Sequence, residues 1–254
     1  MYTTILTRVE DGVGIITLNR PDVLNGLSLV MREELLLALQ EMEIDENIKV
    51  LLINANGRGF CAGGDIKEQG AGFDAISGRA RVRNLHRSLK LMVNMEKPIV
   101  VAVNGVAAGA GFSLALAGDF IIAAEEAKFS QVFINIGFVP DYGSAYFLPR
   151  MIGVAKAKEL IFTGRTIGGQ EAYDLGIVAK VVPLAQLDAA AMEIAKTMAQ
   201  RSAKALAFDK MMLNKSMDTD FDTMLELEAF AQGICFQSDE HKQALKKLLD
   251  SKKK

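Results

Sequence analysis

Two glycine-rich segments of this 254-residue chain, residues 57–67 and 104–115, hold backbone groups suited to chemistry. Residues 104–115 follow an apolar run typical of a buried strand and lead into an apolar run typical of a buried helix. The first N–H groups of a helix lack intrahelical partners and lie at the positive end of its dipole. Glycines and alanines leave such groups open to an anion, or to an oxygen that becomes anionic during a reaction. The segment therefore predicts chemistry on a carbonyl group.

Residues 57–67 form a second junction of this kind, between a predicted strand at 50–55 and a following helix. Neighbouring parallel strands present their carboxyl ends at one edge of a sheet, where α/β folds place ligands. Each junction would then offer a backbone N–H to the same oxygen. Taken singly, each glycine cluster is equally well explained by a tight turn. The two together indicate a site.

Two better-known motifs within residues 104–115 are incomplete. The sequence GAGFSL lacks the third glycine of the dinucleotide-binding motif G-x-G-x-x-G, and no strand ending in an acidic residue follows at the expected distance. The sequence GFSLA approaches the nucleophile motif G-x-S-x-G, but Ser113 would need a histidine base. The chain has only His86, in an Arg-rich stretch, and His241, in a polar C-terminal stretch. Both histidines are predicted to be surface residues, so a catalytic triad is not expected.

The composition is that of a globular protein. Half of the residues are hydrophobic, 24% are charged and the net charge is −2, so neither nucleic acid nor an acidic membrane is an expected partner. Cys61 and Cys235 make no disulfide framework, which favours a reducing compartment. No signal peptide and no apolar stretch of membrane-spanning length is recognisable. We expect a soluble, cytoplasmic protein.

The order of patterns along the chain predicts an α/β fold. A hairpin is expected at residues 5–18, with Asp11-Gly12 at its turn. Further strands are predicted at 50–55, 99–103, 120–124, 127–130 and 179–182, and helices at 33–42, 81–95, 155–162, 169–175 and from 187 onward. This pattern predicts a core domain of residues 1–190, followed by a helical region of residues 191–254.

Six short motifs occur in a characteristic order: LNRP at 18–21, GFCAGGD at 59–65, KP at 97–98, AVNG at 102–105, AKF at 127–129 and LIFTG at 160–164. In these motifs the chain resembles the crotonase (enoyl-CoA hydratase/isomerase) superfamily, from residue 5 to its C-terminus. The resemblance implies an α/β fold, a ClpP-like spiral of ββα units with a C-terminal helical trimerisation region. It also implies a homotrimer or dimer of trimers. The implied substrate is an acyl-CoA thioester, with no metal and no cofactor beyond the CoA of the substrate.

The same resemblance implies which residues form the site. The backbone N–H groups of Gly64 and Ala110 would hold the thioester oxygen and stabilise the enolate that develops on it. The residues expected to contact the substrate are Ala62, Gly63, Asp65, Ile66, Phe133 and Tyr142. Arg20 or Lys67 would reach the phosphates of CoA.

The acid–base residues depart from the hydratase pattern. Hydratases of this superfamily use two glutamates to activate water, and Ser113 and Phe133 stand at the matching positions. A carboxylate occurs instead at Asp141. Isomerase branches, including the ring-epoxide isomerase of bacterial phenylacetate breakdown, carry a catalytic acid at this position. The resemblance therefore implies an enoyl-CoA isomerase that shifts a double bond by proton transfer through Asp141.

Other roles for Asp141 remain open. It could act as a nucleophile in acyl-CoA hydrolysis or dehalogenation, or only cap the helix that follows, a position that Asp favours. The chain could also retain hydratase-like chemistry, or bind CoA esters without turnover. In the isomerase mechanism, Phe133, Phe138 and Tyr142 would exclude water and raise the pKa of Asp141.

Overall fold

The N-terminal hairpin is formed as expected. The computed structural model describes residues 1–65, 72 and 74–251. Strands β1 (Ile5–Glu10) and β2 (Val13–Leu18) pair antiparallel around Asp11 and Gly12, whose φ angles are 49° and 80°. Two consecutive positive φ angles give the turn a twist that matches that of the strands, which explains the Asp-Gly sequence.

The predicted longer strands form a six-stranded sheet in the order β1-β2-β3-β5-β7-β10. Its remaining strands are β3 (Val50–Ala55), β5 (Ile99–Val103), β7 (Phe120–Ala124) and β10 (Lys180–Val182). From β2 to β10 every neighbouring pair is parallel. Strands buried on both faces appear in the sequence as continuous apolar runs, as these do.

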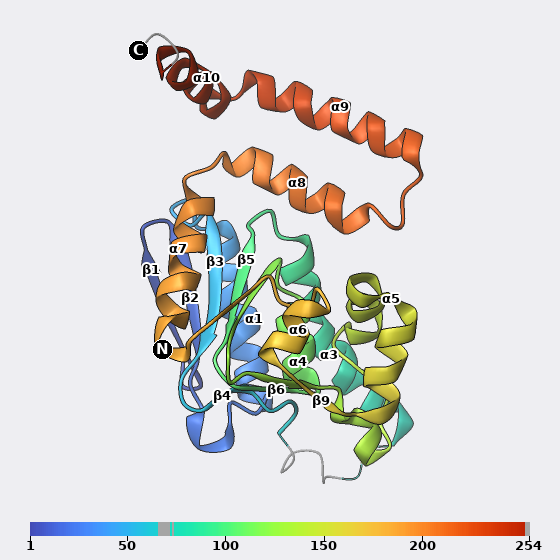
Figure 1. Ribbon diagram of the computed structural model, residues 1–254. Helices are drawn as coiled ribbons and strands as arrows, with labels where there is room; N and C mark the ends of the chain where they lie inside the picture. Colours follow the sequence, from blue (N-terminus) through green and yellow to red (C-terminus); the bar gives the residue numbers. More distant parts are fainter. Residues whose placement is uncertain (66–71, 73, 252–254) are drawn as a thin grey trace.

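A second sheet of four three-residue strands lies across the end of the first (Figure 1). It contains β4 (Gly59–Cys61), β6 (Val106–Ala108), β8 (Lys128–Ser130) and β9 (Thr166–Gly168), in that order. The chain repeatedly adds one strand to the large sheet, the next to the small sheet and then a helix: β3-β4-α3, β5-β6-α4 and β7-β8-α5. This is the expected spiral of ββα units.

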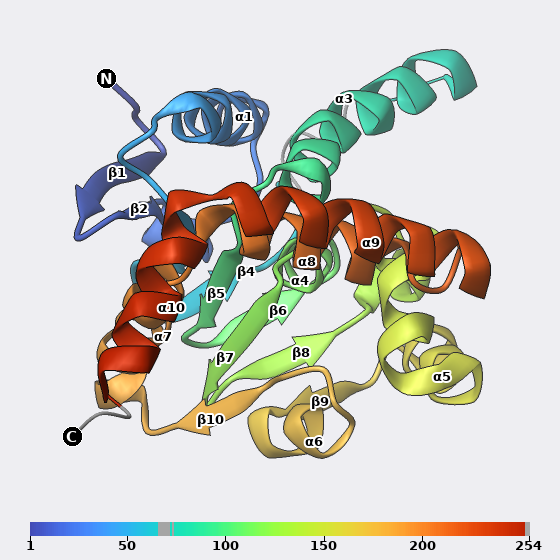
Figure 2. The same ribbon diagram turned by 90° about the horizontal axis from the view of Figure 1, so that it is seen from above.

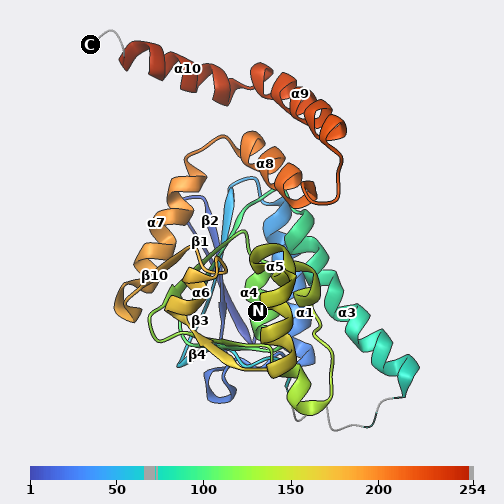
Figure 3. The same cartoon turned by 45° about the vertical axis from the view of Figure 1, so that its right-hand side comes forward.

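Helices cover both faces of the large sheet (Figures 2 and 3). Helices α1 (Leu29–Ile44) and α3 (Ala75–Asn94) pack on one face, and α7 (Leu187–Ala199) packs on the other. Side chains that alternate along each strand enter one core or the other. Helices α1 and α3 begin at Leu29 and Ala75, before the predicted positions 33 and 81, because the side chains of Ser28 and Asp74 cap them.

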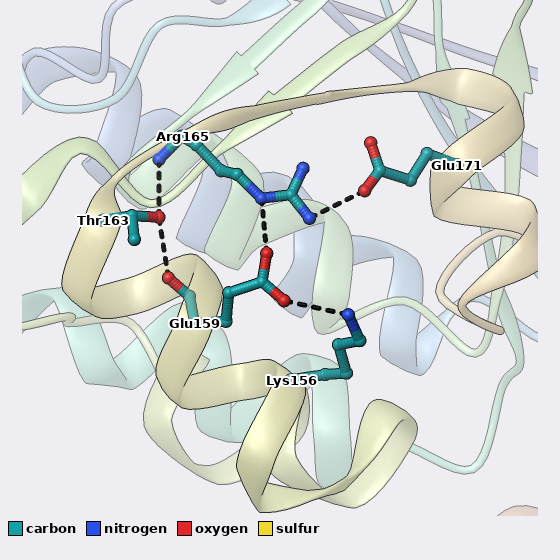
Figure 4. A network of polar contacts seen from close by, with 5 residues as sticks. All are labelled: Lys156, Glu159, Thr163, Arg165 and Glu171. Atoms are coloured by element: carbon teal, nitrogen blue, oxygen red, sulfur yellow. Dashed lines mark hydrogen bonds and ion pairs between the residues drawn. The ribbon is translucent and has the colours of Figure 1, made fainter.

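Helix α5 (Ser144–Thr163) joins the two helical segments that the sequence predicts around residues 146–162. Gly153 interrupts it with φ 77° and ψ 156°. Arg165 ties the end of α5 to α6 (Gly169–Asp174), because its guanidinium donates to Glu159 and to Glu171, each at 2.7 Å (Figure 4). The short helix α4 (Ala110–Leu116) is buried along its whole length.

Three C-terminal helices lie beyond the end of the large sheet (Figure 1). They are α8 (Ala203–Lys215), α9 (Phe221–Gln237) and α10 (Asp239–Ser251). The predicted domain boundary at residue 190 lies within α7, which packs on the sheet and so continues the core. None of the described helices is both long and apolar enough to cross a membrane.

Candidate active site

The two glycine-rich junctions are in direct contact. Strands β4 and β6 pair in parallel, so the segments that follow them leave the small sheet side by side. A Cβ atom on Gly63 would lie 2.8 Å from the carbonyl oxygen of Ala108 and 3.4 Å from the backbone N of Ala110. A Cβ atom on Gly111 would lie 2.0 Å from the carbonyl oxygen of Cys61. Glycine is therefore required at both positions for the backbones to approach this closely.

Two N–H groups at this junction remain available. Neither Gly64 N–H nor Ala110 N–H donates a hydrogen bond to any residue that the structure describes. Their neighbours are engaged: the Gly63 carbonyl accepts a backbone hydrogen bond of 2.8 Å, and Gly109 N–H donates one of 2.9 Å. Ala110 is also the first residue of α4, whose dipole favours negative charge there. The arrangement suits an oxygen that gains charge.

Asp141 has the environment of a general base. It lies in the loop between the 3-10 helix Val132–Ile136 and α5, and its buried Oδ1 has no hydrogen-bond partner among the described residues. Burial raises the pKa of this carboxyl from 3.8 to about 6, although the Arg32 guanidinium on α1 acts in the opposite direction. The N-cap of α5 is Gly143, and no side chain caps the helix. The interpretation of Asp141 as a helix cap is therefore wrong.

The aromatic residues expected around Asp141 have different surroundings. Phe133 is 7% exposed, and its ring lies 3.6 Å from the position that a Cβ atom on Gly109 would take. Tyr142 is 2% exposed, and its hydroxyl lies 2.6 Å from Ser88 Oγ on α3. Phe138, by contrast, is 54% exposed.

The residues expected to contact the CoA lie in the first glycine-rich segment, after β4, together with Arg20. Asp65 forms a 3.0 Å ion pair with Arg20, which also donates to the carbonyl of Gly26. This pairing engages the guanidinium that was expected to reach the phosphates of CoA. Ala62 is half-buried, and its N–H donates to a backbone carbonyl at 2.9 Å. The other two predicted contacts, Ile66 and Lys67, lie outside the described residues.

The two positions that carry glutamate in hydratases supply no carboxylate here. Ser113 is fully buried, and its hydroxyl donates to the carbonyl of Gly109 at 3.1 Å. Phe133 places an apolar ring beside the same glycine. His86 lies on α3, where partial burial and the cations Lys90 and Arg83 lower its pKa. No group of three His, Cys, Asp or Glu side chains suited to a metal ion occurs within residues 1–65, 72 and 74–251.

Sequence analysis did not identify two residues that act on this site, Arg32 and Ser88. Arg32 influences the pKa of Asp141, and Ser88 holds the hydroxyl of Tyr142. Both lie on amphipathic helices far from Asp141 in the sequence. The one signal in the sequence is at Ser88, a polar residue among the apolar residues on the buried face of α3.

The chain matches known proteins over nearly its whole length. The sequence profile of the enoyl-CoA hydratase/isomerase family matches residues 8–254. A 1,2-epoxyphenylacetyl-CoA isomerase of Escherichia coli K12 is 35% identical over 98% of this chain and 96% of that protein. A short-chain-enoyl-CoA hydratase of Clostridium acetobutylicum is 34% identical over 98% of this chain and 95% of that protein.

Solved structures agree with this relationship. The crystal structure of an enoyl-CoA hydratase from Bacillus anthracis has a TM-score of 0.94 at 33% identity, over 98% of this chain and 97% of that one. The contact between the two glycine-rich junctions and the family match over residues 8–254 support the same relationship. The chain has the crotonase fold and belongs to the enoyl-CoA hydratase/isomerase family of acyl-CoA-processing enzymes.

Proposed function

We propose that this protein is an enoyl-CoA isomerase that moves a carbon–carbon double bond by proton transfer through a thioester enolate. The observation that carries the proposal is Asp141, a half-buried residue whose Oδ1 is shielded from solvent and whose pKa is raised to about 6. A base whose pKa lies near the working pH is both deprotonated and able to accept a proton. The substitutions at Ser113 and Phe133 leave the two-glutamate route to hydration without its carboxylates.

The first step is formation of the enolate. The thioester oxygen accepts hydrogen bonds from the N–H groups of Gly64 and Ala110, which makes the proton on the alpha carbon more acidic. As Asp141 removes that proton, negative charge moves to the oxygen. Loss of one such donor raises the barrier in comparable sites by about 2.7–4 kcal/mol.

The second step returns the proton to another carbon. With a 3-enoyl thioester, removal of the alpha proton gives a dienolate, whose charge extends to the gamma carbon. The protonated Asp141 donates its proton there, and the double bond then lies between the alpha and beta carbons. One carboxyl serves as base and then acid, and the reaction needs no cofactor besides the CoA of the substrate.

The names of the relatives support two chemistries. The E. coli relative is named an isomerase and the Clostridium relative a hydratase. Hydration needs groups that hold and activate a water molecule. In hydratases the second of these groups is a glutamate, and this chain has the apolar ring of Phe133 at that position. The isomerase needs only the single carboxyl, which is why we favour it.

A panel of CoA esters tests the proposal. Wild type and Asp141→Asn are assayed with 3-enoyl, 2-enoyl, aromatic and epoxide esters. We expect 3-enoyl-CoA turnover by wild type and a loss of at least about 10³-fold in Asp141→Asn, with ester binding retained. Hydration of 2-enoyl-CoA as the main activity would contradict the proposal. A covalent acyl-enzyme trapped with an aromatic ester would instead identify Asp141 as a nucleophile.

A further inference from the structure

Tyr142, the residue after Asp141, is fixed at both its backbone and its hydroxyl. Its φ of 52° lies in the left-handed region, which bulky residues rarely adopt. Its ring is 2% exposed, and its hydroxyl lies 2.6 Å from Ser88 Oγ. The Ser88 hydroxyl also donates to the carbonyl of Leu85 at 3.1 Å. Because serine has one proton to donate, the Tyr142 O–H is the donor in its contact with Ser88.

The Asp141 carboxyl lacks such an attachment. Its buried Oδ1 makes no hydrogen bond to any described residue. The direction of the carboxyl therefore depends on the backbone at residues 141–142, which is held in its unusual conformation by the buried ring of Tyr142. A base must lie within hydrogen-bond reach of the proton that it removes, so small displacements of this backbone matter.

We propose that Ser88 and Tyr142 are positioning residues: their hydrogen bond ties the Asp141 loop to α3 and holds the carboxyl at the substrate's alpha carbon. This inference rests on the proposed role of Asp141 as the base. The bond spans 54 residues of sequence and connects two different turns of the spiral. The groups that act electrostatically on Tyr142 are Arg32 from α1, Cys61 from β4 and Asp141 itself.

Two variants remove this bond while preserving the packing. Ser88→Ala and Tyr142→Phe each delete one hydroxyl, and both retain the buried aromatic ring. We expect kcat to fall about 5- to 10-fold in each, with KM within about twofold, since the bond orients the base and does not bind substrate. A looser loop admits water to Asp141, so the acidic limb of the pH–rate profile should move to lower pH.

The neighbouring Tyr146 provides a matched control. Its hydroxyl donates to Asp218 at 2.7 Å, on the side of α5 that faces the C-terminal helices. Tyr146→Phe loses a similar hydrogen bond without affecting the Ser88 contact, and its kcat and pH profile should match those of wild type. The double variant Ser88→Ala/Tyr142→Phe should be no slower than the worse single variant, because both changes remove the same bond.

The positioning role of Ser88 and Tyr142 can be tested separately from the isomerase proposal, by a measurement that needs no substrate. A carbon-13 NMR titration of the aspartate carboxyls, with Asp141 assigned by its loss in Asp141→Asn, reports its pKa without any substrate. The positioning role predicts a lower Asp141 pKa in Ser88→Ala and Tyr142→Phe, and no change in Tyr146→Phe. An Asp141 signal and kinetics that respond equally to all three variants would overturn it. An inactive wild type with the predicted NMR shifts would overturn only the isomerase proposal.

Discussion

At the scale of single residues, the surroundings of Asp141 lower the stability of the fold and raise the pKa of the carboxyl toward a value useful for catalysis. The residue is half-buried, and its Oδ1 is shielded from water without a compensating hydrogen bond in the described part of the chain. A soluble protein keeps such a group at a cost in stability, because a buried charge without a hydrogen-bond partner is poorly solvated. Active sites commonly retain groups of this kind, since the same burial adjusts the pKa for catalysis.

This cost predicts the effect of Asp141→Asn on stability. The folded-state pKa of about 6 exceeds the ordinary value of 3.8, so the folded protein binds the proton more tightly than the unfolded chain does. Wild type therefore loses stability as the pH rises from about 4 to about 6. Above that window Asp141→Asn should be more stable than wild type, by about 2–3 kcal/mol.

Urea unfolding at a series of pH values measures this difference. The advantage of Asp141→Asn should be full at pH 7 and disappear near pH 4. Asp209→Asn is a suitable control, because Asp209 is exposed on α8 and is not part of the site. A variant that is less stable than wild type at pH 7 would show that the ionised carboxyl is stabilised by the fold.

At the scale of elements, buried runs of five or six apolar residues made the large sheet predictable. Strands β4, β6 and β9 were not predicted, because these three-residue strands lie between closely spaced glycines, which resemble turns. The glycine content of the two junctions predicted their close contact, whereas the roles of Gly64 and Ala110 rest on the family resemblance and remain predictions. Arg32 and Ser88 were not, because only the fold brings their helices to the Asp141 loop.

Helix α8 is attached to the core by an ion pair between the buried Lys210 and the partly exposed Asp119. Lys210 Nζ lies 2.8 Å from Asp119 Oδ2 and donates to the carbonyl of Met92 at 2.8 Å. Burial lowers the pKa of Lys210 and raises that of Asp119, and the attraction between the two acts against both changes. Removing Lys210 takes a donor from the carbonyls of Met92 and Lys97, whereas Asp119 still accepts from the Ile99 N–H.

Lys210→Met should therefore destabilise the protein by about 1–3 kcal/mol. Lys196→Met is the matched control: Lys196 pairs with Glu10 and Asp11 at the surface, where loss of an ion pair costs less than about 1 kcal/mol. Urea unfolding gives both values, and amide hydrogen exchange should show faster exchange in α8 only for Lys210→Met. Equal effects of the two substitutions would contradict a role for the pair of Lys210 and Asp119.

At the scale of the whole molecule, the C-terminal helices expose an unusual amount of apolar surface. They extend away from the core (Figure 1), and the following α9 side chains are 44–75% exposed: Phe221, Leu225, Phe230, Ile234 and Phe236. Exposed apolar patches of this kind mark association surfaces. We propose that copies of this chain associate through these helices as a homotrimer or a dimer of trimers.

Charged substitutions on α9 test this assembly. Phe230→Glu combined with Ile234→Glu should convert the oligomer into monomers in sedimentation equilibrium, because burial of either carboxylate in an interface is costly. Phe162→Glu is the control, since Phe162 on α5 is also 67% exposed but lies outside the C-terminal helices. A wild type that sediments as a monomer at all concentrations would contradict the proposed assembly.

The most direct test of proton transfer by Asp141 follows a 3-enoyl-CoA ester with the enzyme in heavy water by proton NMR. The account predicts that wild type converts it to the 2-enoyl isomer and exchanges its alpha protons. Asp141→Asn should do neither, although the ester still protects it against thermal unfolding. Double-bond migration or alpha-proton exchange by Asp141→Asn at the wild-type rate would contradict the assignment of Asp141 as the base.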